Sequence, residues 1–388
     1  MYKYMEYQRK YKKYKRKYIT LKSEIDTTTG IQKKCTISET DKIILGHGGS
    51  TALIVISKDN NVYKIFTTYI FENSDEKTIH ERIYKENKRV NNEISIYKLL
   101  TKNIIDTNIS DHFVKYINET NCNNANELFK DCPRSYIDFL KLSNDKKTKI
   151  CSMKYMGFPF TKLQENYRIV EIEYCDYNCS DFINELSKLP VMLIERYLDI
   201  FFFQIIYTLV ATKKIYPYFS HNDLFMRNIL GMKEKDNGNF YTYTFNKKNY
   251  YIPQKFFFPK ISDFGMTNLN KEFHDVNLFK SSIKDLFNIL YDIYNGGNLG
   301  SKSLSELCKD DQNKINFLKI YFGKYFNVNT IDEYILNSKS YMDWDWNNIL
   351  DLDFLKSIEM KEPEYLLDGY FYGIFGTINK QLFHYKSV

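Results

Sequence analysis

The apolar segment IFFFQIIYTLVA, residues 200–211, narrows the possible folds of this chain more than any other stretch of its sequence. A helix that crosses a bilayer needs about 20 apolar residues, whereas this segment is shorter and contains Gln204. We therefore expect a buried helix over residues 190–214. The chain has 388 residues, of which 43% are hydrophobic, so it can build a core that surrounds such a helix.

The positive charge of the chain is concentrated at its N-terminus. Residues 1–22 contain nine Lys or Arg and one acidic residue, whereas the whole chain carries a net charge of +7. Tyrosines here alternate spacings of three and four, as in a coiled-coil seam, at Tyr4, Tyr7, Tyr11, Tyr14 and Tyr18. The pattern predicts a basic helix over residues 1–30. Such a helix either docks on an acidic partner, a nucleic acid or an anionic membrane, or leans on its own domain.

The cysteines and the first residues of the chain indicate the cellular compartment in which the protein is expected. The seven cysteines are scattered and form no C-x-x-C pair, which favours reduced thiols inside a cell. The charged N-terminus is not followed by the apolar region of a signal peptide. We therefore expect a soluble, intracellular protein without a transmembrane segment.

Short β-rich segments precede a mostly helical remainder. The patterns predict a helix at 77–100 and strands at 42–46, 52–58, 62–67, 111–120 and 167–175. A Lys- and Asn-rich insertion, about residues 121–166, separates the last two strands. The result is a predicted α+β fold, in which a small lobe with an antiparallel β-sheet and one main helix precedes a larger, mostly helical lobe.

Polar residues gather directly after the apolar helix, in the stretch FSHNDLFMRNIL at 219–230. Asn228 follows Asp223 at a spacing of five residues. A second carboxylate, Asp263, stands in the stretch ISDFG at 261–265, directly after an apolar strand.

These motifs follow a glycine-rich stretch, LGHGGSTALIV at 45–55, and a strand lysine, and in this order they resemble the eukaryotic-type protein kinase superfamily. The resemblance implies a bilobal fold that binds ATP and Mg²⁺, with an N-lobe over residues 40–173 and a C-lobe over 174–388. It also implies that ATP is held by Gly46, His47, Gly48, Gly49 and Leu53.

The resemblance assigns two further parts of the ATP site. Lys64 would contact the α- and β-phosphates and pair with Glu93 on the following helix, or with Glu86 if the register differs. The main chain of Glu173 and Cys175, in the segment that joins the two lobes, would hydrogen-bond the adenine.

The remaining roles fall on the two loops. Asp223 would be the catalytic residue that orients the acceptor hydroxyl, and Arg227 would balance charge on the γ-phosphate, as in tyrosine kinases. Asn228 and Asp263 would bind Mg²⁺.

The sequence departs from the kinase pattern where peptide substrates are bound. Asn222 replaces the usual Arg, Thr51 replaces the third glycine, and the segment after Asp263 is short and lacks an A-P-E motif. A β-hairpin is expected as an insertion at about residues 231–257. This hairpin is either decoration or a replacement for the missing substrate platform.

The resemblance extends to divergent serine/threonine protein kinases of giant DNA viruses, such as mimivirus, in its Lys-, Asn- and Tyr-rich composition. It implies an ATP- and Mg²⁺-dependent protein serine/threonine kinase, located in the host cytoplasm or the virion if the protein is viral. Two alternatives stay open. One is a small-molecule kinase of the choline or aminoglycoside type, and the other is a catalytically weak pseudokinase scaffold.

Overall fold

The structure is a computed structural model that describes residues 35, 42–44, 52–57, 60–66, 69–71, 76–123, 160–163, 167–186, 188–189, 191–234, 238–254 and 256–269. Several predicted features lie outside these residues. They are the basic helix at 1–30, the glycines Gly46, Gly48 and Gly49 with His47, most of the insertion at 121–166, and the helical region that follows residue 269.

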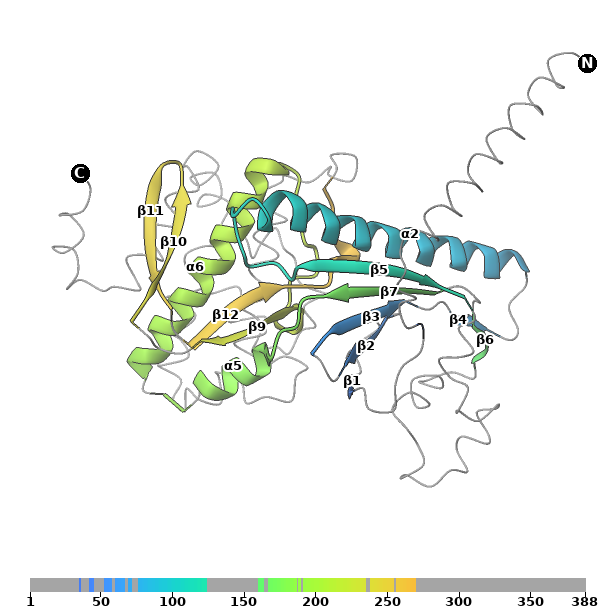
Figure 1. Ribbon diagram of the computed structural model, residues 1–388, viewed down its shortest axis with the longest axis horizontal. Coiled ribbons are helices and arrows are strands. Elements are labelled where there is room, and N and C mark those ends of the chain that lie inside the picture. Colours follow the sequence, from blue (N-terminus) through green and yellow to red (C-terminus); the bar gives the residue numbers. More distant parts are fainter. Residues whose placement is uncertain are drawn as a thin grey trace, which may run out of the picture. The chain divides into compact units, whose positions relative to one another are not determined.

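The described residues form an α+β fold of helices and small sheets (Figure 1). The α-helices are α2 (Glu76–Leu100), α5 (Cys179–Leu186) and α6 (Val191–Ile215), and the short helical turns are η1 (Thr101–Ile105), η3 (Met226–Asn228) and η4 (Phe264–Met266). The strands are β1 (Lys42–Ile44), β2 (Ala52–Ile56), β3 (Val62–Phe66), β4 (Tyr69–Phe71), β5 (Tyr116–Cys122), β6 (Phe160–Leu163), β7 (Tyr167–Ile172), β8 (Tyr177–Asn178), β9 (Ile229–Glu234), β10 (Phe240–Phe245), β11 (Lys248–Pro253) and β12 (Phe256–Ile261).

The chain divides into two compact units. Unit 1 comprises Met1–Asp59, Tyr63–Glu72 and Glu119–Ile169, and unit 2 comprises Asn60–Val62, Asn73–Asn118 and Val170–Val388. Strands β1, β2, β4 and β6 belong to unit 1, whereas α2, α5, α6 and β8 to β12 belong to unit 2. The predicted lobe boundaries at 40–173 and 174–388 stay a prediction.

Among the described residues, the largest sheet has five strands in the order β1-β2-β3-β7-β5. Strands β1 and β2 are antiparallel, with Lys42 opposite Ile56, and β4 pairs with β6 in the same sense. These strands are rich in β-branched and aromatic residues, which fit a pleated and half-buried surface. Val55, Ile65 and Phe66 supply buried side chains on this sheet.

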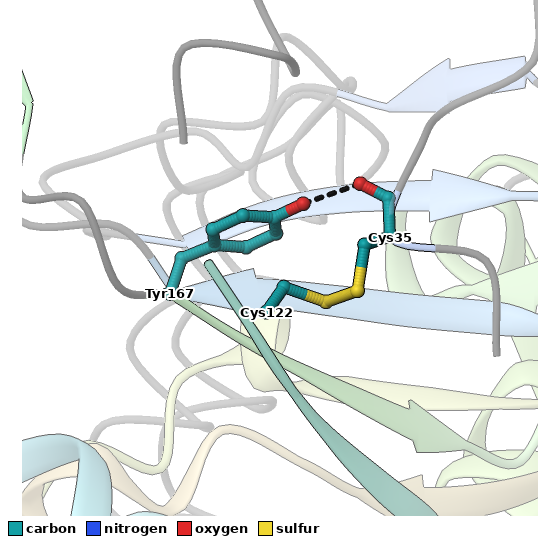
Figure 2. Close-up of a disulfide and its surroundings, with 3 residues drawn as sticks. All are labelled: Cys35, Cys122 and Tyr167. Atoms are coloured by element: carbon teal, nitrogen blue, oxygen red, sulfur yellow. Dashed lines mark hydrogen bonds between the residues drawn. A yellow bond between two sulfur atoms is a disulfide. The ribbon is translucent and has the colours of Figure 1, made fainter. Parts of the chain in front are cut away.

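A disulfide in unit 1 corrects the expectation that all cysteines are reduced. Cys35 and Cys122 are joined across a sequence separation of 87 residues (Figure 2). The hydroxyl of Tyr167 donates a hydrogen bond to the carbonyl oxygen of Cys35, and Cys122 is buried at the end of β5. The sequence pattern missed this pair because proximity of distant cysteines is a tertiary property.

Helix α6 lies in unit 2, and the prediction of a buried helix is confirmed. Phe201, Phe202 and Phe203 are all buried, and the ring of Phe201 stacks on that of Phe182 in α5. Because consecutive phenylalanines point to different sides of a helix, their common burial means that protein surrounds α6. None of the helices in the described part of the chain combines the length and apolarity needed to cross a membrane.

Strands β9 and β12 are antiparallel partners, and β8 extends their sheet on the other side of β9. The hairpin β10–β11 is inserted between them in sequence, inside the range predicted for it. The first and last residues of that predicted range belong instead to β9 and β12. Gly231 of β9 lies close beside its neighbour β12, because an added Cβ would stand 2.4 Å from the carbonyl oxygen of Phe258.

Candidate active site

The loop after α6 is fixed by a buried histidine. His221 is fully buried, and its Nε2 lies 3.0 Å from the carbonyl oxygen of Ser262. A carbonyl oxygen only accepts, so Nε2 carries the proton. The Nδ1 atom then accepts from the main-chain N–H of Asp223 at 3.3 Å. One imidazole therefore connects the loop of Asp223 with the residue that precedes Asp263.

Both oxygens of the Asp223 carboxylate have a partner. Arg227 donates to Oδ1 at 2.8 Å, and Asn228 donates to Oδ2 at 3.0 Å through Nδ2. The same Nδ2 lies 2.6 Å from the main-chain oxygen of Asp223. The short turn η3 brings these three residues together, since it spans Met226–Asn228. The carboxylate is held in one orientation and stays partly exposed, with 27% of the side-chain surface accessible.

The loop of Asp223 is joined to the strand end that carries Asp263. Ser262 donates to the main-chain oxygen of Asn228 through its N–H at 2.8 Å and its hydroxyl at 3.0 Å. Further along, Ser220 and Asn268 exchange two main-chain hydrogen bonds. The predicted site residues Asp223, Asn228 and Asp263 therefore lie on two segments that are directly bonded to each other.

Asp263 has a left-handed backbone conformation, with φ 63° and ψ 70°. A residue with a side chain rarely adopts this region, and strained backbone of this kind is frequent at functional sites. The conformation is held by Tyr97 of α2, whose hydroxyl accepts the N–H of Asp263 at 3.2 Å. The ring of Phe264 packs edge-on against Tyr97 with centroids 4.6 Å apart.

Glu93 of α2 is placed near this turn. It is only 2% exposed, and its Oε2 lies 3.3 Å from the point where a Cβ of Gly265 would stand. The alternative, Glu86, is less buried and pairs with Arg89. The structure thus brings Glu93, rather than Glu86, to the Asp263 turn.

Of the other predicted ATP-site residues, Lys64 and Leu53 belong to unit 1, Glu173 and Cys175 belong to unit 2, and the glycines with His47 lie outside the described residues. Lys64 is a buried residue of β3, 5% exposed, and its Nζ lies 5.4 Å from the ring centroid of Phe66. Leu53 lies on β2. The pairing of Lys64 with Glu93 stays a prediction, as do the roles of the glycines.

Glu173 and Cys175 follow β7 in unit 2. The main-chain N–H of Glu173 donates to the carbonyl oxygen of Lys115, and its carboxylate accepts from Lys260 at 2.9 Å. Burial raises the pKa of the Cys175 thiol to about 12, and the neighbouring Glu173 adds to this effect. The thiol is therefore neutral and unreactive at ordinary pH.

The sequence reasoning missed the residues that hold the site together. Lys260 is one of them, with a side chain only 6% exposed and both Glu173 oxygens within 3.0 Å. A single lysine inside the apolar strand FFFPKI was the available signal, because a buried lysine needs an anionic partner. Ser262 and Tyr97 gave no local signal for their contacts.

The donor set suits a metal and a phosphate group. The Asp263 carboxylate and the amide oxygen of Asn228 are hard oxygen ligands, which Mg²⁺ prefers and which it combines with phosphate oxygens. Arg227 supplies a positive charge within the same loop, and its guanidinium stacks over the ring of Phe225 at 4.4 Å. With Mg²⁺ and a nucleotide bound, these residues would supply a metal site and a positive charge, two of the parts that phosphoryl transfer uses.

Comparison with known proteins points to the same class of chemistry. No protein-family model matches the chain. The chain is similar to a protein with a kinase-type name, and the similarity covers 74% of this chain and 78% of that protein. The relative is the Acanthamoeba polyphaga mimivirus protein named "Putative serine/threonine-protein kinase R301", and the two are 27% identical over 326 residues. This similarity supports a kinase-type relationship.

Proposed function

We propose that this chain is an ATP- and Mg²⁺-dependent protein serine/threonine kinase with a bilobal kinase fold. The observation that carries the proposal is the fixed carboxylate of Asp223, which Arg227 and Asn228 hold within one loop. That loop is bonded through Ser262 to the segment of Asp263. The similarity to the mimivirus protein supports the same class of reaction.

In this proposal each residue has one task. Asp223 orients the acceptor hydroxyl and accepts its proton, and the fixed carboxylate lowers the entropy cost of reaching the reactive geometry. Asn228 and Asp263 would hold Mg²⁺, which neutralises the phosphate oxygens as charge shifts toward the leaving group. Lys64, aided by Glu93, would hold the α- and β-phosphates.

A small-molecule kinase is the second candidate. Its support is the short segment after Asp263 and the absence of an A-P-E motif, because that segment forms the platform for peptide substrates in protein kinases. The two candidates share the phosphoryl-transfer site and differ in the acceptor.

An acceptor experiment tests the proposal. The full chain is incubated with Mg²⁺ and ATP labelled at the γ-phosphate, first with a generic basic protein and then with choline and an aminoglycoside. Acid-stable phosphoserine or phosphothreonine in protein is the expected result. Label in a small molecule alone would favour the second candidate. ATP that binds in the presence of Mg²⁺ without any transfer of label would contradict both and support a scaffold.

A further inference from the structure

The inserted hairpin β10–β11 is joined to the interior of unit 2 through a buried histidine. His112, in the loop between η1 and β5, is fully buried. Its Nε2 lies 2.7 Å from the hydroxyl of Tyr243 in β10, and its Nδ1 lies 2.7 Å from the carbonyl oxygen of Pro259 in β12. Figure 1 shows the hairpin beside α6, on which Tyr243 packs against Phe203.

The direction of every hydrogen bond in this chain of contacts is determined. The Pro259 carbonyl only accepts, so His112 carries its proton on Nδ1 and accepts through Nε2. Tyr243 must then donate its hydroxyl hydrogen to His112, and the Tyr243 oxygen accepts from Gln204 of α6 at 3.1 Å. Burial keeps His112 neutral, because it lowers the pKa of the imidazole to about 3, and the charge of Lys260 acts in the same direction.

His112 holds β12 at two points. Besides the contact with Pro259, its main-chain oxygen accepts the N–H of Ile261 at 2.8 Å, and Val114 donates to the oxygen of Ile261 at 2.9 Å. The imidazole also stacks on the ring of Phe258 with centroids 4.2 Å apart. Hydrogen bonds and a ring contact from the His112 loop therefore fix the strand segment that leads into Asp263.

The left-handed backbone conformation of Asp263 depends on these contacts to β12. A left-handed aspartate persists only where the surrounding structure fixes it. Tyr97 fixes its N–H from α2, and β12 fixes the chain that enters the turn. A change in the position of β12 would carry the Asp263 carboxylate with it.

We propose that His112 and Tyr243 are positioning residues for Asp263, and that the inserted hairpin serves to supply the Tyr243 hydroxyl that orients His112. The metal-binding part of this proposal rests on the proposed function, whereas the positioning of β12 does not. This role differs from the two interpretations that the sequence left open for the hairpin, namely decoration and a substrate platform.

The test compares two variants of the full chain. Tyr243→Phe removes the donor to His112 and keeps the ring. Tyr207→Phe is the matched control at the same junction, because the Tyr207 hydroxyl contacts the main-chain oxygens of Ile109 and Thr244 but not His112. Each variant removes the hydroxyl of a buried tyrosine, so a purely structural role predicts comparable effects.

Three readouts separate the outcomes. Nitrogen NMR of wild type is expected to show His112 protonated on Nδ1 alone at pH 7, and a proton on Nε2 would overturn the proposal. Amide exchange at Ile261 is expected to be about tenfold faster in Tyr243→Phe and unchanged in Tyr207→Phe, as for one lost buried hydrogen bond. Equal exchange in both variants, or no change in Tyr243→Phe, would also overturn it.

The third readout is the Mg²⁺ concentration for half-maximal ATP binding. We expect an increase of about tenfold in Tyr243→Phe, as for a residue that orients a metal ligand, and less than about twofold in Tyr207→Phe. If wild type binds no ATP with Mg²⁺, the proposed function fails, while NMR and amide exchange still decide whether His112 positions β12. An unchanged Mg²⁺ requirement in Tyr243→Phe would overturn the link to Asp263.

Discussion

Two buried histidines carry opposite tautomers, and each is set by one carbonyl oxygen. His221 is protonated on Nε2 because it faces the oxygen of Ser262, whereas His112 is protonated on Nδ1 because it faces the oxygen of Pro259. Both residues bond the segment that leads into Asp263. At the scale of single residues, two neutral imidazoles therefore hydrogen-bond the segments on which Asp223 and Asp263 stand.

The buried His112 makes stability depend on pH. Its pKa is lowered to about 3 in the folded chain, so between this value and the ordinary 6.5 only the unfolded chain binds the proton. The free energy of unfolding should therefore fall as the pH falls through this window, by about 1.4 kcal/mol per pH unit from this residue. Stability contributed by the neutral imidazole is complete above pH 6.5.

Urea unfolding between pH 7 and pH 4 measures this slope. His112→Asn keeps a donor near Pro259 and cannot titrate. Its free energy of unfolding should therefore change less steeply with pH than that of wild type, by about 1.4 kcal/mol per pH unit. The carboxylates contribute equally to both proteins and cancel in the difference. Identical slopes would mean that His112 is protonated in the folded state as readily as in the unfolded one.

At the scale of elements, Gly231 shows how closely β9 and β12 approach. A Cβ at this position would also stand 2.6 Å from the ring of Phe257. Gly231→Ala should therefore lower the free energy of unfolding by about 1–3 kcal/mol through overpacking. Thermal unfolding of the variant measures the loss.

Gly238→Ala is the control for this substitution. Gly238 has a positive φ of 74° and no neighbour within 4 Å of an added Cβ, so alanine costs only the conformational strain, about 1 kcal/mol. A larger loss at Gly238 than at Gly231 would contradict the close approach of the two strands.

The disulfide of unit 1 gives a second prediction at this scale. Closing a loop between residues 87 apart should stabilise the folded chain by about 4.5 kcal/mol in the chain-entropy account. Cys122→Ser should lower the melting temperature in oxidising buffer and have a much smaller effect in reducing buffer. Cys175→Ser, at a free thiol, is the control and should show no dependence on the buffer.

The elements were predictable where a local pattern decides them. Helix α6 was expected at 190–214 and spans Val191–Ile215, because its apolar run fits only a buried helix. The strand expected at 111–120 instead spans Tyr116–Cys122. Phe113 and its neighbours bond to Ile261, far along the chain, and a local pattern cannot show such a partner.

Across the whole molecule, sequence spacing selected the candidate site residues but not the residues that support them. The five-residue spacing selected Asp223 and Asn228, since both lie within one loop. Their connection to Asp263 through Ser262 is a tertiary contact, as is the ion pair of Lys260 with Glu173. These supports are single residues that show their partners only in the fold, and of them only Lys260, alone in an apolar strand, gave a local signal.

In the proposed function, Asp223 stands at the reacting centre of a phosphotransferase. The most direct measurement is the initial rate of γ-phosphate transfer from ATP by Asp223→Asn, with ATP affinity measured on the same sample. Asp106→Asn, which removes a carboxylate from an exposed ion pair with Lys115, is the control. We predict a rate about 10²–10⁴-fold below wild type for Asp223→Asn, with little change in ATP affinity, and a wild-type rate for the control. A rate for Asp223→Asn close to that of wild type would contradict the claim.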